Sequence, residues 1–126
     1  MTLRNLLTVS SILGLLFGLG AVLAPGPVTS LYGANLNLSG TVVAQFYGAA
    51  LIGLGTLGWL ARDFTDAQAL RAVVLSSLIA DTIGFLVALL GQLAGGANSL
   101  GWSTVVIYLL LALGFAYFQF VKPIKS

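Results

Sequence analysis

The sequence lacks cysteine, histidine and glutamate, and it has few charges of either sign. Without cysteine or histidine, the chain has no disulfides, thiolate nucleophiles, imidazole bases or haem-ligating histidines. Charged residues make up 6% of the 126 residues, whereas a soluble domain carries about 25%. A water-soluble surface cannot be built from so few charges.

Several kinds of functional motif are also missing. The chain has no HExxH motif, no paired carboxylates and no glycine loop between a strand and a helix that could bind phosphate. We therefore expect no catalytic residues, no metal site and no cofactor, and the chain is not predicted to be an enzyme. The five cations are spread over three short segments, so we expect no nucleic-acid partner.

Most of the chain consists of four apolar runs. About 20 helical residues cross a hydrocarbon core of about 30 Å, so each run is long enough to span a membrane. The sequence therefore predicts an all-α polytopic membrane four-helix bundle made of two helical hairpins, in a single domain over residues 1–126. The predicted spans are about 6–23, 41–61, 72–93 and 100–120.

The first run has an alternative interpretation as a secretory signal peptide. Arg4 precedes it, and small residues near Ala24 stand at the spacing of a cleavage site. Pro25 follows that site directly and should block cleavage. We therefore expect this run to be kept as the first span.

The positions of the basic residues predict the orientation. The segments 24–40 and 94–100 have no charge at all, whereas every basic residue falls on the other side of a four-span arrangement. Lysine and arginine near the ends of spans are retained in the cytoplasm. The sequence therefore predicts cytoplasmic termini and a cytoplasmic loop over 62–71. The basic residues are Arg4, Arg62, Arg71, Lys122 and Lys125.

The outer connection over 24–40 is longer than a tight turn. It contains Pro25 and Pro27, followed by apolar residues partly at helical spacing. One interpretation is a short helix lying in the membrane interface and started by the prolines. The other is an ordered loop packed over the helix ends.

Small residues at helical spacing mark one face of each span. Lipid removes the hydrophobic force between helices, so close approach through small residues has to supply the contact area. These faces could be used within one bundle or between copies of the chain. The predicted helix-packing residues are Gly14, Gly18, Gly48, Gly55, Ser76, Ala80, Gly84 and Ala88.

Asp81 is the one acidic residue inside a predicted span, near the middle of the third. An ionised side chain at that depth costs roughly 2.5 to 3.5 kcal/mol on insertion scales. We predict an intramembrane polar network of Asp81, Ser77, Tyr108 and Ser11, with Ser10 as an alternative to Ser11. The carboxyl group could have a structural role and hold helices together by hydrogen bonds. It could also be a titrating site for a proton, a cation or an amine.

Two functional hypotheses follow. The first is a structural or accessory membrane subunit that packs in the bilayer with copies of itself or with a larger complex. The alternative is a small proton- or cation-linked transporter or channel that uses Asp81. The expected partners are the lipid bilayer, a further copy or membrane complex, and a lipid or other hydrophobic ligand.

The chain resembles a family of small bacterial membrane proteins with four spans, similar to DoxX-like proteins. The resemblance implies a bacterial inner-membrane location and a single four-helix domain, and it implies no activity. The segments that carry it are Pro25, Leu31 to Gly33, Tyr47 to Gly55, Trp59 to Arg62, and Leu113 to Tyr117.

Overall fold

The computed structural model describes residues 2–124, which form helices and connecting turns without a strand. Four helices are long and apolar enough to cross a membrane, as in a multi-pass membrane protein. The predicted all-α fold is confirmed. The elements are α1 (Leu3–Leu23), α2 (Pro25–Leu31), α3 (Leu38–Ala61), α4 (Ala67–Leu93), α5 (Gly101–Ala116) and the π-helical turn η1 (Tyr117–Val121).

Polar cap residues start three of the long helices a few residues before the apolar runs. The side chains of Thr2, Asn37 and Asp66 accept hydrogen bonds from the free backbone N–H groups of the first turns of α1, α3 and α4. The short α2 begins with Pro25, whose fixed φ suits the first helical position. Of the two interpretations of this connection, the short helix is the one present, and it contains both prolines.

Two glycines in left-handed conformation follow helix ends. Gly95 has a φ of 82° just beyond α4, and Gly33 has a φ of 76° just beyond α2. A side chain strains this conformation, so glycine suits both turns. At the end of η1, the Lys122 N–H bonds the carbonyl of Tyr117, five residues earlier, and the chain continues into Pro123.

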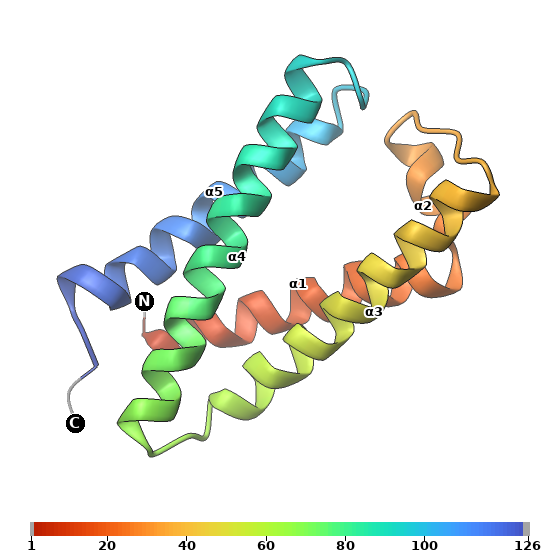
Figure 1. Ribbon diagram of the computed structural model, residues 1–126. Coiled ribbons are helices and arrows are strands. Elements are labelled where there is room, and N and C mark those ends of the chain that lie inside the picture. The colour runs from red at the N-terminus through yellow and green to blue at the C-terminus, as the bar shows by residue number, and fades with distance from the viewer. Residues whose placement is uncertain (1, 125–126) are drawn as a thin grey trace.

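The bundle consists of two helix pairs, α1 with α3 and α4 with α5, which run side by side in Figure 1. Glycines bring α1 and α3 together. A side chain on Gly18 would have its Cβ 2.8 Å from the carbonyl oxygen of Gly48, and one on Gly48 would lie 2.7 Å from the carbonyl oxygen of Gly18. Gly14 and Gly55 meet further along the same contact, about one turn away on α1 and about two turns away on α3. A side chain at either position would not fit, so the two backbones approach to a distance that requires glycine.

The two pairs meet in a buried cluster at one end of the bundle. This charged end carries Arg4, Arg62, Arg71 and Lys122, and in Figure 1 it holds the loop between α3 and α4. Phe115 and Val74 have no exposed surface there, and Leu7 is only 2% exposed. The cluster consists of Leu6, Leu7, Ala61, Val73, Val74, Leu111, Phe115 and Phe118.

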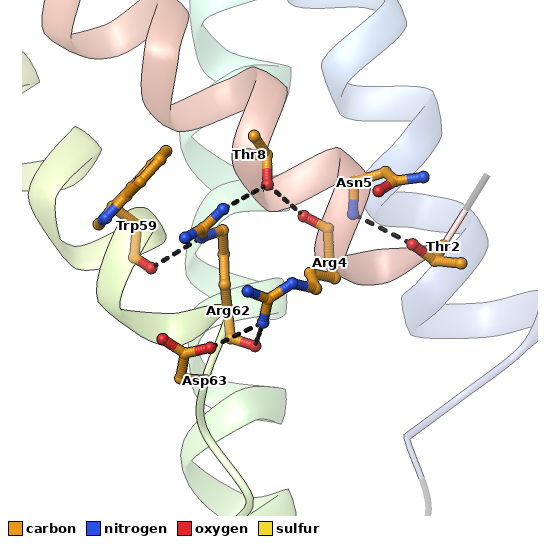
Figure 2. A network of polar contacts seen from close by, with 7 residues as sticks. All are labelled: Thr2, Arg4, Asn5, Thr8, Trp59, Arg62 and Asp63. Carbon is orange, nitrogen blue, oxygen red and sulfur yellow. Dashed lines mark hydrogen bonds and ion pairs between the residues drawn. The ribbon is translucent and has the colours of Figure 1, made fainter.

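A polar network covers the charged end (Figure 2). Arg4 pairs with Asp63 at 2.7 Å and also donates to the carbonyl of Arg62. Arg62 donates to the hydroxyl of Thr8, and its guanidinium lies 3.6 Å from the ring centre of Trp59. The hydrogen bond and the positive charge of Arg4 lower the pKa of the Asp63 carboxyl. The Arg4–Asp63 pair is exposed, so it adds little stability by itself, but the network joins the start of α1 to the end of α3.

The opposite, uncharged end consists of α2 and the connection between α4 and α5, which lie close together in Figure 1. Asn98 links them. Its side-chain amide donates to the carbonyl of Leu31, and its backbone N–H donates to the carbonyl of Tyr32. The Asn98 side chain also accepts from the N–H of Leu100 at the start of α5. The two helix pairs are thus joined at both ends.

Candidate functional site

A cavity of about 350 Å³ lies between the two helix pairs. All five α-helices contribute to its walls, which are mostly apolar. Val73, Leu7 and Leu111 belong both to the walls and to the buried cluster, so the cluster closes the cavity toward the charged end. The polar residues that line the cavity are Ser10, Thr29, Tyr32, Tyr47, Ser76, Ser77, Asp81, Thr104 and Tyr108.

Asp81 is the one charged residue among those that line the cavity. It stands near the middle of α4 and is neither fully buried nor fully exposed. Across residues 2–124, its carboxylate forms no ion pair and no hydrogen bond. Ser77, one turn earlier on α4, lines the same cavity. An acid in a mostly apolar cavity is thus left free to bind something else.

Tyr108 of α5 lies beside Asp81 because Gly84 makes room for it. The Tyr108 ring occupies the space that a side chain on Gly84 would need, and Gly84 is one turn beyond Asp81. The Tyr108 hydroxyl forms a hydrogen bond with the hydroxyl of Tyr47 on α3. This bond crosses from one helix pair to the other at the cavity.

A second pair of hydroxyls lies nearer the uncharged end. The Thr104 hydroxyl on α5 is 3.5 Å from that of Tyr32, which follows α2. Gln45 and Gln92 donate to the backbone carbonyls of Val22 and Asn98. They hold helix ends and do not line this cavity.

The structure brings together three of the four residues of the predicted polar network. Asp81, Ser77 and Tyr108 line one cavity. Ser11 does not. Its hydroxyl donates to the carbonyl of Leu7 at 2.6 Å, it is 1% exposed, and it fills the space beside Gly58 of α3. The alternative, Ser10, is the serine of α1 that faces the cavity.

The predicted packing face of α4 serves different purposes along its length. Ser76 and Ala80 line the cavity instead of contacting another helix closely. Gly84 receives the Tyr108 ring, and Ala88 lines a shallower pocket near the uncharged end. The small residues of α4 therefore provide space more than helix contact.

Tyr47 is the cavity residue that sequence reasoning did not connect with Asp81. The signal that could have linked it to Tyr108 is depth, since α3 and α5 both start at the uncharged end and the two tyrosines follow a similar number of residues into them.

The chemistry of this site is that of one acid with several hydroxyls in apolar surroundings. In the described part of the chain, no three acidic, cysteine or histidine side chains lie close enough to hold a metal ion. A single carboxylate with neutral hydroxyl neighbours can take up a proton, or it can bind a cationic group.

Comparisons of the chain with protein-family models, with curated proteins and with solved structures found no match. Membership of a DoxX-like family therefore stays a prediction from sequence. The geometry of the cavity is the basis for a functional proposal.

Proposed function

We propose that this protein is a small membrane transporter that moves a proton or a cationic substrate through the cavity between its two helix pairs. The observation that carries the proposal is the position of Asp81, which lines this cavity without a hydrogen-bonding or ion-pairing partner among residues 2–124. An ionisable group inside a membrane span marks a functional site by default.

The alternative, structural role of Asp81 needs a hydrogen-bonding partner on another helix. In this cavity Tyr47 and Tyr108 form a hydrogen bond between helices with each other and not with Asp81. An unpaired ionised side chain in a span costs roughly 2.5 to 3.5 kcal/mol. A bound proton or cation would offset this cost, whereas the surrounding protein groups do not.

We propose that the chain lies in a bacterial inner membrane with both termini in the cytoplasm. The location is implied by the family resemblance. The orientation is supported by the charge distribution, because Arg4, Arg62, Arg71 and Lys122 stand at one end of the bundle and the other end carries no charge. Basic residues beside spans favour the cytoplasmic side.

A second candidate function is an accessory subunit that packs against another membrane protein. It is favoured by Gly53 of α3 and Gly91 of α4, where an added Cβ would meet no atom within 4 Å. Small residues open to the outside of a bundle allow the backbone of another helix to approach closely. A further copy of the chain and a larger complex are both suitable partners.

Replacement of Asp81 tests the transport proposal. Proton flux would be measured with an internal pH dye in liposomes, driven by a potassium gradient and valinomycin. We expect wild-type flux above that of protein-free liposomes, and flux at the protein-free level for Asp81→Asn, which keeps the shape but cannot take up a proton. Asp81→Glu should keep part of the flux. Asp63→Asn, which removes an exposed acid at the charged end, should keep all of it.

The result that would contradict transport is equal flux for the wild type and Asp81→Asn, with both variants helical by circular dichroism. Loss of assembly by Asp81→Asn with recovery in Asp81→Glu and no wild-type flux would instead support the accessory function.

A further inference from the structure

We infer that the ligand of the cavity is a mostly apolar molecule that carries one positive charge on an ammonium group. This inference rests on the proposed role of Asp81 and names the class of its substrate. The charge of the cavity, its hydrogen-bonding groups, its walls and its size all match such a ligand.

The charge of the cavity selects the charge of the ligand. Asp81 is its one acid, and no lysine or arginine lines it. An anion would therefore meet a like charge without a compensating cation, and a neutral molecule would leave the charge of the carboxylate uncompensated. A divalent metal ion requires about six oxygen ligands, several of them normally charged. One carboxylate matches one positive charge.

The hydroxyl groups match the donors of an ammonium group. A primary ammonium has three N–H donors and no acceptor. The Asp81 carboxylate can accept one or two of them in a charge-assisted hydrogen bond. Ser77 and Tyr108 line the same cavity and have free oxygen lone pairs, because the bond between Tyr47 and Tyr108 uses only part of the capacity of the tyrosine hydroxyls.

The walls match an apolar body. Most of the remaining surface is made of aliphatic and aromatic side chains, among them Leu13, Phe17, Leu51 and Ile107. Aromatic faces also attract a cation within about 6 Å of the ring centre. A sugar or another molecule with many hydroxyls would find too few hydrogen-bonding partners on these walls.

The volume sets the size of the molecule. Ligand pockets commonly measure about 300 to 1,000 Å³, so a cavity of about 350 Å³ lies at the small end. It suits a single ring with a short chain better than a lipid with long acyl chains. A small phenylalkylamine has the required shape and charge.

Three matched probes test this inference on the unmodified protein. They are 4-phenylbutylamine, 4-phenylbutan-1-ol and 5-phenylpentanoate, which share one phenylbutyl group and differ in charge. Binding would be measured by isothermal titration calorimetry in nanodiscs of phosphatidylcholine, with empty nanodiscs as a blank. We expect the amine to bind at least about ten-fold more tightly than the alcohol, since a hydrogen bond to a charged group contributes this much or more. The carboxylate should bind most weakly.

Two variants assign the preference to Asp81. In Asp81→Asn the amine and the alcohol should bind alike, whereas Asp81→Glu should keep the preference for the amine. Equal binding of amine and alcohol to the wild type overturns the inference, whatever the variants do. So does a preference for the amine that is unchanged in Asp81→Asn.

These results are separable from a failure of the proposed function. If protons cross the membrane in an Asp81-dependent way and the protein binds the amine no more tightly than the alcohol, the substrate class is wrong and transport stands. If the amine binds through Asp81 and neither it nor a proton crosses the membrane, the site is correct and the transport proposal fails.

Discussion

The contact between α1 and α3 gives the sharpest test of how the fold is held together. In Gly48→Ala, the new Cβ would lie 2.7 Å from the carbonyl oxygen of Gly18 and 2.8 Å from the Cβ of Ala21. Both distances are far below van der Waals contact, and both atoms belong to the backbone or directly adjoin it. A rotamer change cannot relieve the clash, so the helices must separate.

Overpacking of this kind costs about 1 to 3 kcal/mol, and we expect Gly48→Ala to lower the free energy of unfolding by that amount. The same helix supplies a matched control. Gly53→Ala places an identical methyl group where no atom lies within 4 Å. Alanine is a better helix former than glycine by roughly 0.5 to 1 kcal/mol, so this control should be neutral or slightly more stable.

Unfolding would be followed by far-ultraviolet circular dichroism during titration of mixed micelles with sodium dodecyl sulfate. Equal midpoints for Gly48→Ala and Gly53→Ala would refute the proposed contact. A double variant provides a further check. Gly18 and Gly48 face each other, so adding Gly18→Ala to Gly48→Ala should cost less than Gly18→Ala alone, because the helices are already apart.

Two other predictions concern the ends of the bundle. Asn98→Ala removes a side-chain hydrogen bond between the helix pairs. Nitroxide labels on cysteines introduced at positions 30 and 99 of this cysteine-free chain should then show a broader distance distribution by pulsed electron paramagnetic resonance. An unchanged distribution would contradict the link. At the charged end, Arg4 lowers the pKa of Asp63. The ion pair therefore stabilises the fold at pH values above the ordinary carboxyl pKa of about 4. This small contribution disappears as the pH falls through the lowered pKa. Asp63→Asn should therefore shift the unfolding midpoint slightly at pH 7 and not at pH 2, and a larger shift at pH 2 would contradict this assignment.

The number and order of the helices could be predicted from the sequence because each apolar run is long enough for one crossing. Their first residues were less predictable. Capped by Asp66, α4 begins at Ala67, five residues before the predicted run at 72, since a capping side chain and a polar first turn belong to the helix without being apolar. Hydropathy locates the part of a helix that lies in lipid, whereas capping locates its start.

The sequence predicts how deep in the membrane the residues of the candidate site lie, but not toward which neighbour each helix turns them. Counting residues along a helix gives depth at 1.5 Å per residue, and this placed Ser77 and Tyr108 near Asp81. The choice between Ser10 and Ser11 depends on a rotation of about 100° around the axis of α1. A helix that is apolar on every side has no polar face to fix that rotation, so the sequence could not show that Ser10 faces the cavity and Ser11 faces α3.

Small residues at four-residue spacing have opposite consequences in the two halves of this bundle, and the partner helix decides which. The glycines of α1 face glycines of α3 at matching depth, so the two backbones close together. The corresponding face of α4 meets no such stripe. It meets Tyr108, whose ring occupies Gly84, while Ser76 and Ala80 are left beside open space. The same sequence pattern thus gives a close helix contact in one helix pair and one wall of a cavity in the other, and Asp81 belongs to that wall.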